Sequence, residues 1–151
     1  MAQVIIADSA CLIALDRIGR LSLLRDLFTS IVIPNAVAEE FGQQLDWFII
    51  QEVASPPLLK VLVNQIDYGE SEVIALALET SDSIAIIDDK KARRIAKDLG
   101  INVIGTIAIV LKAKQNDIIP AVKPILDDLN SVGFHLSKNL YTKALALAGE
   151  E

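Results

Sequence analysis

Apolar and polar positions are arranged along the chain in short blocks, and each block predicts one element. Apolar runs bounded by polar or turn residues have the pattern of buried parallel strands, and we predict strands at residues 4–7, 31–33, 84–87 and 101–104. Apolar residues at helical spacing follow the runs, and glycines stand near several segment ends. They predict helices at residues 9–18, 21–28, 36–41, 68–79, 90–99, 106–114, 120–129 and 139–148.

The stretch from residue 43 to residue 66 is harder to assign. Residues 46–50 fit either a helix turn or a strand, and the pair Pro56 and Pro57 indicates a break. Residues 59–66 are predicted to form a short strand at a sheet edge. Asn35 is predicted to cap the helix that follows it, and Ser137 to cap the last helix.

Strands that alternate with helices predict an α/β protein with a parallel, doubly wound sheet. The 151 residues suit one domain, residues 1–151, and we see no linker or internal repeat. Hydrophobic residues make up 52% of the chain and aromatic residues only 5%, so the core must be aliphatic. No apolar run is long enough to span a membrane and the first residues lack a signal sequence, which favours a cytoplasmic protein.

Charge and cysteine content limit the chemistry further. The formal net charge of -6 opposes broad attraction to nucleic acid, so such a substrate would need a local basic patch or a metal bound to acids. Cys11 is the only cysteine and cannot form an internal disulfide. His135 is the only histidine and lies far from the acidic motifs, which excludes acid-base chemistry by two histidines.

Acidic residues end two of the predicted strands. Asp8 follows the first strand, Asp88 and Asp89 follow the strand at residues 84–87, and Glu70 opens the helix that leads into that strand. Ligands bind at the carboxyl edge of open α/β sheets, so these acids, together with Glu40, are candidates for one site. Glu39, Glu72 and Asp89 are their neighbours.

Each acid also has a purely structural interpretation. Asp8 and Asp88 each precede a helix as an N-cap would, and Glu70 and Glu72 complement the dipole at a helix start. A cluster of carboxylates without histidine or cysteine suits Mg²⁺ or Mn²⁺, which prefer oxygen ligands. Such an ion activates water and stabilises charge on a phosphoryl oxygen, as metal-assisted phosphodiester hydrolysis requires.

A basic segment follows these acids directly. Its cations recur at helical spacing, so one flank of the helix would follow a phosphate backbone, although a solvated helix face has the same pattern. The candidate RNA-binding residues are Lys90, Lys91, Arg93, Arg94 and Lys97.

Four stretches resemble, in order and spacing, the acidic motifs of PIN-domain ribonucleases: residues 4–9, 34–41, 69–77 and 86–89. The likeness covers about residues 3 to 147. It is closest to the VapC-like proteins of prokaryotic toxin–antitoxin pairs, in particular a subgroup with Gly-Glu-x-Glu before a helix and Ile-Gly-Thr after the last core strand, here residues 104–106.

The resemblance implies a three-layer α/β/α sandwich with a central, mainly parallel sheet. It also implies that Asp8, Glu40, Glu70 and Asp88 bind Mg²⁺ or Mn²⁺ and catalyse RNA cleavage, with Glu72 and Asp89 as further metal ligands. The partners it implies are RNA, a small antitoxin protein and a second copy of the chain. Three positions depart from the family pattern: Glu70 stands where Asp is commoner, Ile86 where Thr is familiar, and Lys90 where another acid is frequent.

The sequence therefore predicts a metal-dependent endoribonuclease, the toxin of a toxin–antitoxin pair. The alternative is a non-catalytic PIN-like module that recruits RNA or a protein partner. A phosphoacceptor receiver domain is a third possibility, but the first strand ends in a single acid, Asp8, rather than a pair.

Overall fold

The computed structural model describes residues 3–150. Met1, Ala2 and Glu151 lie outside the described residues, so the two ends of the predicted domain, residues 1 and 151, lie there too. Within residues 3–150, no helix has the length and apolar character needed to cross a membrane.

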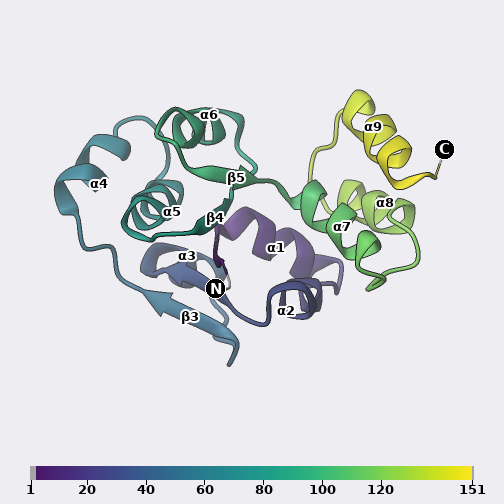
Figure 1. Cartoon of the computed structure of the whole chain (residues 1–151), viewed down its shortest axis with the longest axis horizontal. Helices are drawn as coiled ribbons and strands as arrows, with labels where there is room; N and C mark the ends of the chain where they lie inside the picture. The colour runs from purple at the N-terminus through teal and green to yellow at the C-terminus, as the bar shows by residue number, and fades with distance from the viewer. Residues whose placement is uncertain (1–2, 151) are drawn as a thin grey trace.

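A sheet of five parallel strands forms the centre of the protein (Figure 1). Its strands lie in the order β3-β2-β1-β4-β5. They are β1 (Val4–Ala7), β2 (Ile31–Pro34), β3 (Phe48–Gln51), β4 (Ser83–Ile86) and β5 (Asn102–Ile104). The prediction of a parallel sheet is confirmed, since every strand pair in it is parallel.

Helices cover the sheet on both faces. The central strands consist almost entirely of buried residues, as they do when both faces of a parallel sheet are covered. Helix α5 (Tyr68–Glu79) packs across β2, β1 and β4. The α/β/α architecture is therefore confirmed. The other helices in the described part are α1 (Ser9–Arg17), α2 (Ser22–Phe28), α3 (Asn35–Phe41), α4 (Pro56–Leu62), α6 (Lys90–Asp98), α7 (Thr106–Gln115), α8 (Lys123–Ser131) and α9 (Lys138–Ala148).

The C-terminal helices stand beside the sheet rather than over its centre (Figure 1). Helix α7 packs on α2 and α9. Near the start of α8, Glu150 accepts hydrogen bonds from the backbone N–H groups of Val122 and Lys123 at 2.8 and 3.0 Å. Lys114 of α7 donates to Glu150 at 2.8 Å. These bonds attach the end of the described chain to both α7 and α8.

Three predicted features are wrong. Residues 59–66 do not form a strand, because Pro56 and Pro57 occupy the first helical positions of α4, where proline starts a helix instead of breaking one. The strand at this edge of the sheet is β3, whose Ile49 is 49% exposed. The helix predicted at residues 120–129 begins later, at Lys123.

The third wrong feature is the predicted cap at Asn35. This residue is already the first residue of α3, and no side chain at the N-cap position bonds the helix start. Instead Glu72, buried in α5, accepts a hydrogen bond from the N–H of Ala36 at 2.8 Å. A residue distant in sequence therefore satisfies this helix start.

Strand order brings the two acidic strand ends together. β1 and β4 are neighbours, with Ala7 paired to Ile86. The N–H of Asp8 continues the ladder by donating to Ile86 O at 3.1 Å. The chain leaves β1 toward β2 on one side, while β4 lies on the other, so the strand order reverses between β1 and β4. The crevice at such a reversal is where open α/β sheets bind ligands.

Glu72→Ala should lower the free energy of unfolding by about 1–3 kcal/mol, because the Ala36 N–H loses its acceptor. Glu72→Gln keeps an acceptor oxygen and should be affected less. Glu39→Ala, on the exposed side of α3, should change the free energy of unfolding by less than about 0.5 kcal/mol. Urea unfolding of the three variants tests the contact, and equal stability of Glu72→Ala and Glu39→Ala would contradict it.

Candidate active site

Asp8 has one carboxylate oxygen in a structural role and one without a partner. It is the N-cap of α1, and its Oδ1 accepts from the N–H of Cys11 at 3.2 Å. Its Oδ2 is buried and has no hydrogen-bond partner within residues 3–150, and the residue is only 2% exposed. A buried oxygen of this kind is costly unless it has a partner. Helix capping therefore explains only half of this carboxylate.

Asp88, at the end of the neighbouring strand, is held by Thr106. Its Oδ1 accepts from the Thr106 N–H at 2.8 Å, and its Oδ2 accepts from the Thr106 hydroxyl at 2.6 Å. Thr106 is fully buried and is the first residue of α7, separated from β5 by Gly105 alone. The carboxylate therefore joins the ends of β4 and β5, and it does not serve as the N-cap of α6.

Burial disfavours the charged forms of Asp8, Glu70 and Asp88, and neighbouring acids add to this effect at Asp8 and Glu70. Burial, followed by the charge of Asp88, raises the pKa of Asp8 to about 8, and Glu70 also contributes. Burial, followed by the charges of Asp67 and Asp89, raises the pKa of Glu70 to about 7. Burial raises the pKa of Asp88, although its bonds to Thr106 and the charge of Arg93 oppose that rise.

Glu40 reaches the same edge from α3. Its Oε1 accepts a hydrogen bond from the hydroxyl of Ser9, the residue after Asp8. A Cβ built on Gly69 would lie 3.4 Å from the same oxygen, so Glu40 also faces the start of α5, where Glu70 stands. The structure thus places the four predicted catalytic acids around one edge of the sheet.

The two further acids predicted as metal ligands have structural partners. Glu72 Oε1 accepts from Ala36 N–H, as described above. Asp89 is the N-cap of α6, and its Oδ2 accepts from the Ala92 N–H at 2.9 Å. Asp89 still lies close enough to Glu70 to affect its charge.

The donor chemistry fits a hard divalent cation. The side chains around the site offer carboxylate oxygens, and one of them, Asp8 Oδ2, is buried without a partner. In residues 3–150, no three His, Cys, Asp or Glu side chains lie together in a way that could hold a metal ion. The acids are therefore neighbours around a shared edge and do not form a closed cage.

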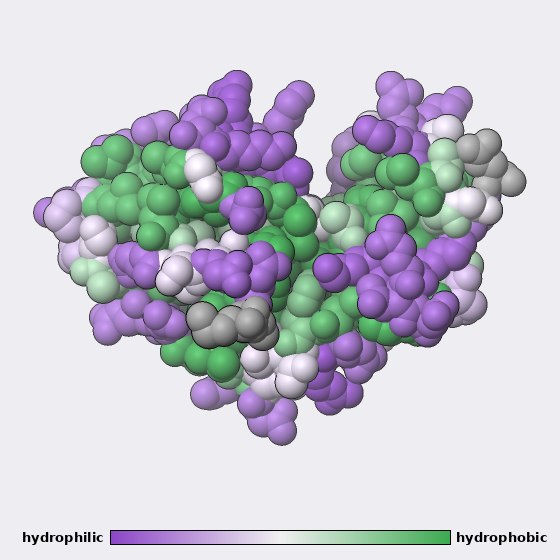
Figure 2. Space-filling model, viewed as in Figure 1, coloured by the Kyte–Doolittle hydropathy of each residue, from purple (hydrophilic) through white to green (hydrophobic). Residues whose placement is uncertain are grey.

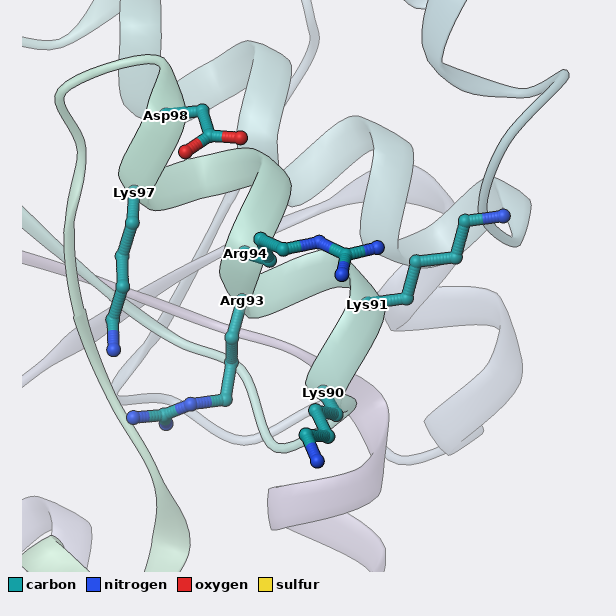
Figure 3. Close-up of a pocket in the computed structure, with 6 residues that line it drawn as sticks. All are labelled: Lys90, Lys91, Arg93, Arg94, Lys97 and Asp98. Atoms are coloured by element: carbon teal, nitrogen blue, oxygen red, sulfur yellow. The ribbon is translucent and has the colours of Figure 1, made fainter.

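The basic residues of α6 divide into two sets. Lys90, Lys91, Arg94 and Lys97 are exposed, and they surround a surface depression together with Arg93 and Asp98. Arg93 alone is half-buried, and its Nη1 donates to Ile87 O at 2.9 Å. Figure 3 shows the Arg93 side chain extending away from Arg94 and Lys91.

A groove of about 440 Å³ opens beside Asp88. Asp88, Arg93 and Gly105 line one side of it, and α7 and α9 supply mainly aliphatic side chains together with Lys143. Figure 2 shows the surface hollowed between the part that carries α6 and the part that carries α9. Of the acids at the site, Asp88 lines this groove.

Sequence patterns did not reveal the roles of several residues at this site. Ser9 and Thr106 bond two of the acids, and Lys143 faces the groove from a helix far along the chain. Thr106 stands two residues after a predicted strand, in the Ile-Gly-Thr stretch at residues 104–106, and that stretch was the available signal. Lys143 had no such signal, because its place depends on how α9 packs on α7.

These observations define the class of protein: a doubly wound α/β protein with carboxylates gathered where the strand order reverses. The chain belongs to the PIN-domain family, whose model matches residues 4–150. Proteins with this domain are generally nucleases. Searches of the curated proteins and of the solved structures gave no match.

Asp8→Asn should stabilise the metal-free protein at pH 8. The Asp8 pKa is about 8 in the folded chain and near 3.8 without the fold. Between these values the folded protein retains a proton that the unfolded chain has released, so stability falls as pH rises from about 4 to 8. The neutral amide of the variant removes this loss. The free energy of unfolding of Asp8→Asn relative to wild type should therefore be larger at pH 8 than at pH 4, by on the order of 2 kcal/mol.

Urea unfolding in EDTA at both pH values measures this effect. Asp46→Asn, at an exposed turn, is the matched control and should keep the wild-type pH dependence. Parallel stability curves for wild type and Asp8→Asn would show that the fold does not penalise ionisation of Asp8.

Proposed function

We propose that this protein is a Mg²⁺- or Mn²⁺-dependent endoribonuclease and the toxin of a toxin–antitoxin pair. The observation that carries the proposal is the buried Asp8 Oδ2, which has no partner and lies where Asp88 and Glu70 raise the pKa of its carboxyl group. Membership of the PIN-domain family supports the nuclease part. Such an enzyme would act in the cytoplasm.

Asp8, Glu40, Glu70 and Asp88 would hold the cation. When bound, it would act as a Lewis acid on the phosphodiester and lower the pKa of a bound water. Asp8 contributes an oxygen with no competing bond, and Asp88 is kept at the adjacent strand end by Thr106. Glu40 and Glu70 approach from α3 and α5. In this proposal, Glu72 and Asp89 have structural roles, because both already accept backbone hydrogen bonds.

The exposed cations of α6 would bind the RNA backbone. They face solvent beside the acidic edge, so a strand held on them would present a phosphate to Asp88. The groove beside Asp88 extends this path toward Lys143 on α9. This local positive surface answers the difficulty that a net charge of -6 poses for RNA binding.

The toxin assignment and the partners rest on the VapC-like motifs at residues 69–77 and 104–106. They support a small antitoxin and a second copy of the chain as binding partners. A short open reading frame beside this gene whose product binds the purified protein would support the pairing. A protein that stays monomeric at micromolar concentration would count against the homodimer.

A second candidate is a non-catalytic module that binds RNA or a protein through the same surface. The observation that favours it is the bonding of the acids within the fold: Thr106 bonds both oxygens of Asp88, while Glu72 and Asp89 each accept a backbone N–H. Measuring Mn²⁺ binding separates the candidates, because only the nuclease requires it.

Wild-type protein should cleave single-stranded RNA in Mg²⁺ or Mn²⁺ and lose this activity in EDTA. Asp8→Asn and Asp88→Asn should abolish cleavage, because each removes an anionic ligand, while Asp46→Asn should retain it. Mn²⁺ titration by calorimetry should show weakened binding in the same two variants. Cleavage that persists in both variants would contradict the assigned residues.

Arg94→Ala and Lys97→Ala should weaken RNA binding without changing Mn²⁺ affinity, since both side chains are exposed beside the site. In fluorescence anisotropy with single-stranded RNA, each should reduce the slope of log K against log salt by about 0.7. Lys60→Ala on α4 is the control. If Lys60→Ala weakens binding as much, α6 does not mark the RNA path.

A further inference from the structure

Asp88 is fixed from two directions. Thr106 bonds both of its oxygens from the start of α7. Arg93 donates to the carbonyl of Ile87, the residue before Asp88, at 2.9 Å. One contact orients the side chain and the other holds the backbone that carries it.

Gly105 shows how closely these groups approach one another. A Cβ at this position would lie 2.9 Å from Asp88 Oδ1 and 3.0 Å from Arg93 Nη1. The backbone of Gly105 has φ -107° and ψ 175°, an extended conformation open to any residue. A side chain at position 105 would therefore displace Asp88 or Arg93, so glycine matters here for space and not for conformational freedom.

Arg93 differs from the other cations of its helix. It is half-buried, and its guanidinium lies against Ile87 and Gly105 and near enough to Asp88 to lower the pKa of that carboxyl group, whereas Arg94 next to it is exposed and extends in another direction (Figure 3). An RNA phosphate that bound the Arg93 guanidinium would compete with the hydrogen bond from Arg93 to Ile87 O. Arg93 therefore supports the site through the backbone next to Asp88.

We propose that Arg93 and Thr106 are positioning residues that together clamp Asp88 beside Asp8. Gly105 has no side chain and so leaves room for this clamp. Without it, repulsion between the two carboxylates would favour rotation of Asp88 away from Asp8. The metal-binding consequence rests on the proposed function, whereas the clamp itself does not. The inference assigns Arg93 a role other than the RNA contact predicted from sequence.

The test compares Arg93→Gln with Arg94→Gln, its exposed neighbour, and Thr106→Val with Thr106→Ser. Arg93→Gln and Thr106→Val should weaken Mn²⁺ binding by about tenfold, because partners that orient metal ligands have effects of this size. Thr106→Ser keeps the hydroxyl and should stay within about threefold of wild type. Arg94→Gln should leave Mn²⁺ affinity unchanged and weaken RNA binding, while Arg93→Gln should lower kcat with little change in RNA affinity.

A second measurement tests the clamp in the absence of metal. The Thr106 amide donates to Asp88 Oδ1, so its ¹H–¹⁵N chemical shift should move in Arg93→Gln and stay in place in Arg94→Gln. Thermal unfolding confirms that each variant is folded. An unmoved Thr106 amide in folded Arg93→Gln, or RNA affinity lost as in Arg94→Gln with Mn²⁺ affinity intact, would overturn the clamp. If wild type binds no Mn²⁺, the proposed function fails, and the Thr106 shift still decides the clamp.

Discussion

The repulsion between two carboxylates at neighbouring strand ends is the constraint on which the site depends. Asp8 and Asp88 follow β1 and β4, which the sheet places side by side. Burial makes their negative charges expensive, as the raised pKa of Asp8 shows. A fold optimised for stability alone would place apolar or neutral groups here. That it keeps two acids supports a function for them.

The surrounding structure opposes this repulsion with hydrogen bonds from the starts of two helices. Cys11 N–H bonds Asp8, Thr106 bonds Asp88, and Ser9 bonds Glu40. Each donor stands in the first turn of α1 or α7, and both helices start at the carboxyl edge of the sheet. The oxygen left over, Asp8 Oδ2, is buried and has no hydrogen-bond partner among the described residues. Each of these acids thus accepts a hydrogen bond, but the group as a whole lacks enough positive charge to balance it.

Much of this site was predictable from the order of residues, for reasons that are local. Asp8 and Asp88 each end an apolar run, and the run length defines where a strand stops. Their adjacency was not predictable in this way, because strand order depends on packing across the sheet. For the same reason, the role of Glu72 could not be predicted, because its bond to Ala36 joins two helices. Nor could the role of Arg93, whose side chain is half-buried although four cations of similar sequence pattern are exposed. The helix at α4 was mistaken because its two prolines signal a break and a helix start equally well.

The pairing of β1 with β4 also has a consequence for biosynthesis. Residues 4–7 are made early, but their neighbour at residues 83–86 appears only after nearly eighty further residues. A nascent chain that has reached β3 already contains Asp8 and Glu40 and lacks Glu70 and Asp88. The acidic edge is therefore divided between two halves of the chain, and neither half translated alone contains the whole site. A cell that makes this protein would meet a complete site only once the second half has folded against the first.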